Sequence, residues 1–265
     1  MSGHVSLSSD DGDARVAVVT LCHRAKFNAM SRAMWRQLQA VFARIQSGDW
    51  RCVLLRGEGA HFCAGGDIAE YPSFRFATAS LRAFHEDEVW GGLRAMLDCD
   101  VPIVAAIAGN CMGAGMEMAS ACDIRVAADD ARFGAPIAKL GFPMAPREAQ
   151  LVARVAGEAT AREMLLEAAV LGAGEMKARG FLHRIEPPDE LLPHAQERAR
   201  RIAALAPRAA RAHKQLFRAL NEPSALSSTA SKAIENIVNG AYDYADSAEH
   251  REGIAAFLEK RPARF

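Results

Sequence analysis

Two short stretches decide the fold: His61-Phe62-Cys63-Ala64-Gly65-Gly66-Asp67-Ile68 and Gly109-Asn110-Cys111-Met112-Gly113-Ala114-Gly115-Met116-Glu117. Each follows an apolar run typical of a buried strand, residues 52–56 for the first and 102–107 for the second. Small residues at such a corner let the backbone approach a ligand and direct free N–H groups at an oxygen atom. If both corners point at the same place, they form a two-donor pocket for an enolate or other oxyanion.

The second corner also supplies a carboxylate. A helix that begins near Gly113 or Ala114 leaves its first amides without intrahelical acceptors, so the Ala114 N–H is a candidate donor. Glu117 lies one turn further along the same face, and its side chain can lean back over that N-terminus. The alternative is a packing corner at which Glu117 only caps the helix or offsets its dipole. The first corner, which repeats the device after a different strand, favours the oxyanion interpretation.

Composition indicates a well-folded soluble protein. The chain has 265 residues, half of them hydrophobic, which suffices for one large core plus a smaller appendage. Its 32 basic residues balance 32 acidic ones, and no stretch approaches a membrane span, so neither nucleic acid nor membrane is an expected partner. Residues 1–16 lack the apolar segment of a conventional secretory signal. The six cysteines are scattered without C-x-x-C spacing, which predicts free thiols in a reducing cytoplasm and no metal site.

The order of predicted elements is typical of α/β layers followed by a helical region. Pro187-Pro188 is the best candidate boundary, so we predict an α/β core carrying the site over 1–188 and a helical region over 189–265. Ser31 can cap the first helix. Besides the two buried strands, strands are expected over 14–21, 124–127 and 131–133, and helices over 32–47, over 79–97 and almost throughout from about residue 145.

Four motifs, in this order, make the chain resemble the crotonase, or enoyl-CoA hydratase/isomerase, superfamily over nearly its whole length. Residues 24–30 resemble its N-terminal CoA loop, 62–68 its first oxyanion segment, 109–124 its second, and 257–261 its C-terminal tail. The resemblance implies a crotonase-like ββα spiral core and a helical C-terminal region used in trimer assembly, often as a dimer of trimers. It also implies an acyl-CoA thioester substrate, with coenzyme A as part of that substrate and no permanently bound cofactor.

The resemblance further implies roles for individual residues. The amides of Gly66 and Ala114 would hold the thioester oxygen, with Glu117 as the catalytic carboxylate beside them. The usual hydration route of the family employs two glutamates around one water molecule, and Glu117 matches the first of them. The coenzyme A contacts that the resemblance implies are Ala25, Phe27, Ala64, Gly66, Asp67, Ile68, Ala69 and Lys260.

One departure from the family pattern bears on the reaction. Where hydratases and many isomerases have a second acid, this chain has Ile137, which cannot transfer a proton. Glu148 is the candidate substitute, because it begins a helix that borders the acyl pocket in this family. The alternative is a helix-start glutamate that is solvated or paired with Arg147. His85 lies in the charged run 84–88 and could border a site opening, but such a run is expected to be a solvated helix face.

These features predict an acyl-CoA enzyme that acts through a stabilised thioester enolate in fatty or carboxylic acyl-CoA metabolism. A hydratase-like lyase is favoured by the overall resemblance and by Glu117, with double-bond isomerase and decarboxylase as alternatives. The alternative of another class is a non-catalytic crotonase-fold protein that binds acyl-CoA or serves in assembly. The missing second acid supports this alternative, whereas the two corners and Glu117 argue against it. The expected assembly is a homotrimer or a dimer of trimers in the cytoplasm.

Overall fold

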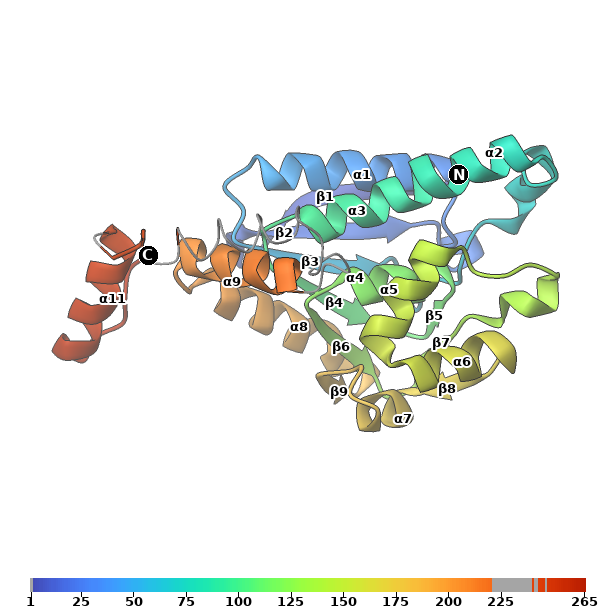
Figure 1. The fold of residues 1–265 in the computed structure, drawn as a ribbon. Helices are drawn as coiled ribbons and strands as arrows, with labels where there is room; N and C mark the ends of the chain where they lie inside the picture. The colour runs from blue at the N-terminus through green and yellow to red at the C-terminus, as the bar shows by residue number, and fades with distance from the viewer. Residues whose placement is uncertain (1, 221–239, 241–242, 246) are drawn as a thin grey trace.

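The computed structural model describes residues 2–220, 240, 243–245 and 247–265 (Figure 1). Its described strands form a six-stranded sheet of order β1-β2-β3-β4-β6-β9 and a three-stranded sheet of order β5-β7-β8. In the larger sheet β1 is antiparallel to β2 and the other neighbours are parallel. The strands are β1 (His4–Asp10), β2 (Asp13–Cys22), β3 (Cys52–Gly57), β4 (Ile103–Ile107), β5 (Asn110–Met112), β6 (Ile124–Ala128), β7 (Arg132–Gly134), β8 (Val170–Gly172) and β9 (Arg184–Glu186).

Helices cover both faces of the larger sheet and continue to the C-terminus (Figure 1). Within the described residues, three short 3-10 helices are η1 (Arg24–Lys26), η2 (Ile68–Ser73) and η4 (Pro136–Leu140), and η3 (Phe84–Val89) is a π-helix. The α-helices are α1 (Arg32–Gln46), α2 (Thr78–Ala83), α3 (Trp90–Asp98), α4 (Ala114–Ala121), α5 (Pro146–Ala156), α6 (Glu158–Leu166), α7 (Ala173–Ala178), α8 (Pro188–Ala203), α9 (Pro207–Leu220) and α11 (Ala248–Glu259).

The chain repeats a unit made of a strand in the larger sheet, a strand or bridge in the smaller layer, and a helix. β4 leads to β5 and then α4, and β6 leads to β7 and then α5. After β3, Cys63 makes an isolated parallel bridge with Cys111 of β5, so the first corner enters the same smaller layer. This repetition is the ββα spiral that the resemblance implied, and the predicted α/β class with C-terminal helices is confirmed.

The buried strands face two cores, which explains their continuous apolar sequences. Because successive side chains of a strand point to opposite faces, Val53 and Leu55 of β3 join the core that contains α1. Cys52 and Leu54 join the core on the other face, where α8 contributes Leu191, Ala195, Ala199 and Ala203. A strand covered on both faces loses the polar alternation of a half-exposed strand.

The first predicted helix starts as its sequence indicated. The Ser31 side chain accepts a hydrogen bond from the Met34 amide and caps α1. The predicted helix over 79–97 is different in the structure, because it divides into α2, the π-helix η3 and α3.

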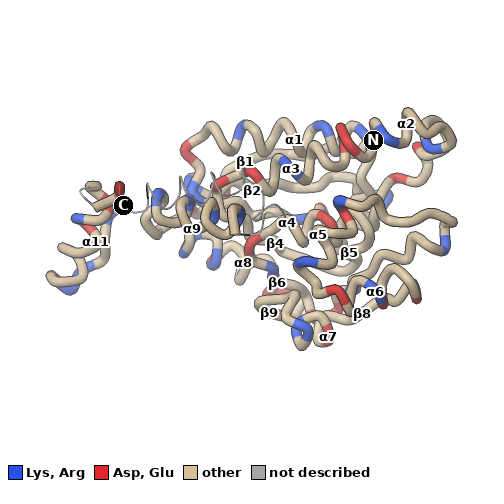
Figure 2. The backbone as a smooth tube through the Cα atoms, in the orientation of Figure 1, with Lys and Arg blue, Asp and Glu red and all other residues tan. Residues whose placement is uncertain are grey.

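The region after residue 188 begins with a helix that packs on the sheet, since α8 contacts β2, β3, β4, β6 and β9. The division of the chain at this point stays a prediction, and residues 221–239, 241–242 and 246 of the proposed helical region lie outside the described residues. Basic and acidic residues are interspersed along the backbone tube (Figure 2), so the charge balance of the sequence extends over the fold. Among the helices of the described chain, none combines the length and apolar character needed to cross a bilayer.

Candidate active site

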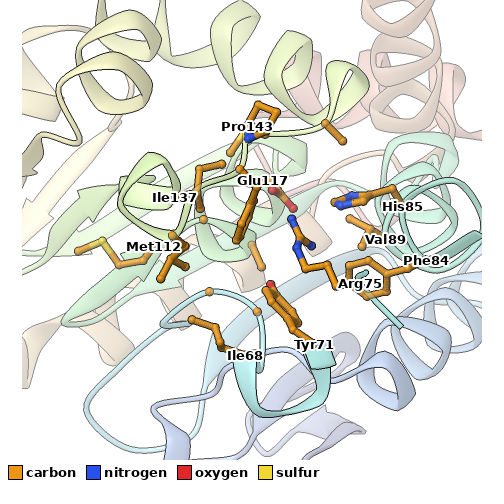
Figure 3. A pocket seen from close by; sticks show the side chains of 18 of the residues that line it. Ile68, Tyr71, Arg75, Phe84, His85, Val89, Met112, Glu117, Ile137 and Pro143 are labelled. Atoms are coloured by element: carbon orange, nitrogen blue, oxygen red, sulfur yellow. The ribbon is translucent and has the colours of Figure 1, made fainter. Parts of the chain in front are cut away.

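A cavity of about 340 Å³ opens where the two corners meet η2, η3 and the η4 loop (Figure 3). Of the predicted site residues, the backbone segments at Ala64, Gly66 and Ala114 line this cavity, together with the side chains of Ile68 and Glu117. Ile137, which replaces the second acid of the family pattern, lines it as well. The fold therefore brings the two glycine-rich corners and the predicted carboxylate to one place.

The first corner leaves one amide of the cavity lining without a hydrogen-bond acceptor in the described chain. Gly66 makes a parallel bridge with Met30, in which the Met30 N–H donates to the Gly65 carbonyl and the Asp67 N–H donates to the Met30 carbonyl, both at 2.8 Å. Because the peptide groups of an extended segment alternate in direction, the N–H of Gly66 itself points away from Met30. Within the described residues, that N–H has no hydrogen-bond acceptor.

The second corner leaves another free amide at the start of α4. Gly113 is the N-cap, with φ of 47° and ψ of −105°, a left-handed conformation that favours glycine. Its own N–H donates to the Gly134 carbonyl at 2.9 Å, and the Glu117 N–H donates to the Gly113 carbonyl at 3.0 Å. Ala114 is the first residue of the helix, and its N–H finds no acceptor in the part of the chain that the structure describes.

Hydrogen bonds fasten the two corners to each other. The Cys63 N–H donates to the Asn110 carbonyl and the Met112 N–H donates to the Cys63 carbonyl, each at 2.9 Å. A Cβ atom added to Gly115 would lie 2.8 Å from the Cys63 carbonyl oxygen, so the backbones are in direct contact there. Gly66 follows Cys63 at the same distance in sequence as Ala114 follows Cys111, the partner of Cys63 in the bridge. Both residues line the same cavity, and the pairing holds their backbone segments next to each other.

Glu117 enters this cavity from α4 as a protonated acid at neutral pH. Burial raises the pKa of its carboxyl from 4.5 to about 8, and the nearby negative charge of Glu148 adds to the increase. A carboxyl group in that state can donate a proton to a substrate carbon.

Glu148 lies behind the cavity wall, where its side chain contacts a histidine that lines the cavity. Its side chain, on α5, is buried, with 2% exposure, and its Oε1 is 3.1 Å from Nδ1 of His85. His85 lines the cavity, whereas Glu148 is absent from the lining. Neither a solvated glutamate nor a pair with Arg147 is observed, because Arg147 pairs with Glu86 at 2.9 Å.

The expected solvated face over 84–88 is wrong for two of its residues. His85 lines the cavity. Glu88 is buried between two arginines, and its Oε1 lies 2.6 Å from Nη2 of Arg32 and 2.9 Å from Nη1 of Arg36. The cause is the π-helix over Phe84–Val89, whose wider turn changes the direction in which these side chains leave the helix. Glu86 and Asp87 are exposed, as the sequence predicted.

Sequence reasoning missed Tyr71 and Arg75, which also line the cavity (Figure 3). The Tyr71 hydroxyl occupies the space that a Cβ atom at Gly66 would need, so the ring lies directly beside the first corner. The Arg75 guanidinium stacks on the ring of Phe142, 3.6 Å from its centroid. Burial raises the pKa of Tyr71 and lowers that of Arg75. The only sequence signal was the spacing of aromatic residues around an arginine in 71–76.

The loop predicted to contact coenzyme A lies next to the first corner. The Ala64 N–H donates to the Phe27 carbonyl at 3.0 Å, and Phe27 is 52% exposed. Asp67 is buried, and both of its carboxylate oxygens accept from Lys26 Nζ at 2.7 Å. The Asp67 carboxylate therefore joins the loop that contains Lys26 to the first corner. The remaining candidates here, Ala25, Ile68 and Ala69, are exposed.

Lys260 is separate from these residues. It follows the last residue of α11 and does not line the cavity. In Figure 1, α11 lies beyond α9, at the end of the molecule remote from α2 and η4. Within one chain, Lys260 does not contribute to the site.

Comparisons with known proteins agree with this arrangement. The Mycobacterium tuberculosis (strain CDC 1551 / Oshkosh) protein named "Probable enoyl-CoA hydratase echA8" is 32% identical over 257 residues, 96% of this chain and 95% of that protein. "Mevalonyl-coenzyme A hydratase SIDH" of Beauveria bassiana is 33% identical over 259 residues, 93% of this chain and 89% of that protein. A crystal structure of an enoyl-CoA hydratase/carnithine racemase from Magnetospirillum magneticum superimposes with a TM-score of 0.90 and 33% identity, covering 100% of this chain and 96% of the other. Residues 11–265 match the enoyl-CoA hydratase/isomerase family, and the chain belongs to that family.

Proposed function

We propose that the protein is a hydratase-like acyl-CoA enzyme, in which the amides of Gly66 and Ala114 form an oxyanion hole for the thioester oxygen. One observation carries the proposal: two amides without acceptors in the described chain line the same cavity as the carboxyl group of Glu117. Each such donor typically contributes about 3 kcal/mol to transition-state stabilisation. The coenzyme A part of the substrate would lie along Gly66–Ala69 and the loop that contains Ala25 and Phe27.

The proton transfers follow from the states of the acidic groups. The oxygen of water attacks the β-carbon of a 2-enoyl thioester, and His85 takes the proton that water releases. The electron pair of the double bond moves to the thioester oxygen, where the two amides stabilise the enolate. Glu117, which is protonated at neutral pH, then gives its proton to the α-carbon. His85 afterwards releases its proton to solvent and Glu117 takes one up, which restores both groups for the next turnover. Glu148 is a positioning residue, because its contact with Nδ1 leaves Nε2 of His85 for the substrate side.

A panel of thioesters tests this function and its alternatives. We expect turnover of crotonyl-CoA to 3-hydroxybutyryl-CoA, followed by the loss of absorbance of the conjugated thioester. Turnover restricted to a 3-enoyl-CoA would instead indicate an isomerase, and turnover restricted to a malonyl-type CoA a decarboxylase. A rise in melting temperature with acyl-CoA but no turnover of any of them would contradict the proposal and favour the non-catalytic binding protein.

Glu148→Gln is expected to lower kcat by about tenfold to a hundredfold with little change in KM, because the imidazole loses the carboxylate that orients it. The pH profile gives a second readout. In the wild type, activity should fall as pH rises through about 8, where Glu117 loses its proton. Removing the negative charge of Glu148 lowers the pKa of Glu117, so the variant should lose activity at a lower pH.

Glu86→Gln is the matched control for this variant, because Glu86 is exposed on the same π-helix and pairs with Arg147. It should leave both kcat and the pH profile unchanged. An unaltered rate and pH profile in Glu148→Gln would remove Glu148 and His85 from the mechanism.

We further propose that the protein assembles as a homotrimer or a dimer of trimers in the cytoplasm. Exposed apolar side chains on the C-terminal helices support self-association, among them Phe217 at 62% and Phe257 at 81% exposure. In such an assembly, Lys260 could meet coenzyme A bound to a neighbouring subunit. Size-exclusion chromatography with light scattering tests the stoichiometry.

A further inference from the structure

The cavity contains a cation that no anion of the described chain neutralises. The guanidinium of Arg75 makes neither an ion pair nor a hydrogen bond with any described residue. It reaches into the middle of the cavity (Figure 3), and burial lowers its pKa. The residue is half-buried, and proteins normally pair a charged group that is partly withdrawn from water. We therefore expect the anion that pairs with Arg75 to belong to the ligand.

The way in which Arg75 is held leaves its hydrogen-bond donors free. Its guanidinium lies 3.6 Å from the centroid of the Phe142 ring and 4.6 Å from that of Tyr71. These are cation–π contacts, and they take no N–H of the guanidinium into a hydrogen bond with the described chain. Those donors match the two oxygens of a carboxylate in a bidentate pair. The two rings therefore hold the guanidinium in the cavity with its N–H donors available to an anion.

We propose that Arg75 binds a carboxylate at the far end of the acyl chain, so that the substrate is the half-thioester of a dicarboxylic acid with coenzyme A. The inference depends on the proposed function, because the amides of Gly66 and Ala114 fix where the thioester lies. Tyr71 connects the two ends, since its hydroxyl adjoins Gly66 and its ring adjoins the guanidinium. One aromatic side chain thus separates the thioester from the anion site, which matches a short acyl chain.

The rest of the cavity suits such a substrate. Trp35, Phe84 and Val89 supply an apolar lining for the methylene groups. Ile137 stands where the family pattern has a second acid, so no carboxylate at that position competes for Arg75 or repels the ligand. Glu117 is protonated at neutral pH and adds no negative charge there.

Calorimetric titration with glutaryl-CoA tests the inference, because this thioester has no double bond to hydrate. The comparison ligands are its neutral isostere, with an isopropyl group in place of the carboxylate, and free coenzyme A. We expect the wild type to bind glutaryl-CoA at least tenfold more tightly than the isostere. Arg75→Met should weaken glutaryl-CoA by about tenfold to a hundredfold and leave the isostere and free coenzyme A within about twofold.

Arg82→Met is the matched control, since Arg82 is exposed on the adjacent helix α2, and it should alter none of the three affinities. Arg75→Lys keeps the charge but loses the planar fork, so it should weaken glutaryl-CoA less than Arg75→Met does. If the methionine variant does not fold, Arg75→Lys provides the test in its place.

Three results would overturn the inference. Equal wild-type affinity for glutaryl-CoA and its isostere would show that the cavity has no carboxylate site, while the proposed function would stand. If Arg75→Met weakened the binding of free coenzyme A as much as that of glutaryl-CoA, Arg75 would contact the coenzyme and not the acyl chain. Failure of the wild type to bind any of the thioesters would contradict the proposed function itself, and the inference with it.

Discussion

Glu117→Gln is expected to lower the turnover of a 2-enoyl-CoA by about 10²- to 10⁴-fold while leaving acyl-CoA affinity within a few-fold of the wild type. Glutamine has nearly the size and polarity of the protonated glutamic acid that the cavity holds at neutral pH, but it cannot give up a proton. Single-turnover kinetics and calorimetric binding to the same variant separate the two effects. Undiminished turnover in this variant would remove Glu117 from the proton transfer.

The melting temperature of the same variant provides an independent control on the protonation state of Glu117. The folded-state pKa of about 8 lies above the ordinary value of 4.5, so the native state holds a proton that the unfolded chain releases between these values. The contribution of this group to the free energy of unfolding is therefore complete below pH 4.5 and is lost as pH rises through about 8. Glutamine does not titrate, so the melting temperature of Glu117→Gln should fall less over that window.

Ala114→Pro is expected to reduce kcat for the same substrate by about 10²- to 10³-fold, because it deletes one of the two proposed oxyanion donors. Proline is tolerated at the first position of a helix, where the N–H has no intrahelical acceptor. The preceding residue, Gly113, lies outside the right-handed helical region that a following proline disfavours. The helix should therefore form normally, and steady-state kinetics with a melting curve would measure the loss.

Glu158→Pro supplies the matched control, since Glu158 is the exposed first residue of α6 and also follows a glycine. It should show wild-type kinetics and a comparable melting temperature. If Ala114→Pro folds and retains full activity, the amide of Ala114 does not stabilise the transition state.

Much of the fold could be predicted because its core strands are buried on both faces. Residues 52–55 and 102–107 are continuous apolar runs that each lead into a glycine-containing corner, and the structure contains β3 and β4 there. Elsewhere in the chain the sequence signals were weaker. β1 is an edge strand with a polar sequence, HVSLSSD, and is held mainly by pairing with β2. β5, β8 and β9 have three residues each, which is too short for a periodic pattern.

The residues of the candidate site also fall into two groups, those that a local sequence pattern predicts and those that it does not. Glycine-rich corners have a local signature, so Gly66, Ala114 and Glu117 could be assigned to one pocket from sequence. The places of His85 and Arg75 depend on tertiary structure. A π-helix turns His85 toward Glu148, which lies 63 residues away in sequence. Stacking on Phe142 brings Arg75 into the cavity, and no periodic pattern in the sequence encodes such a contact.

The central claim, that the amides of Gly66 and Ala114 bind one thioester oxygen, is tested most directly by isotope-edited vibrational spectroscopy. The ligand is glutaryl-CoA labelled with ¹³C at the thioester carbonyl, bound to the wild type and to Ala114→Pro. Two converging donors polarise the carbonyl and weaken its double bond, so its stretching frequency should fall on binding to the wild type and should recover part of that shift in the proline variant. A bound thioester whose carbonyl frequency equals that in free solution would contradict the account.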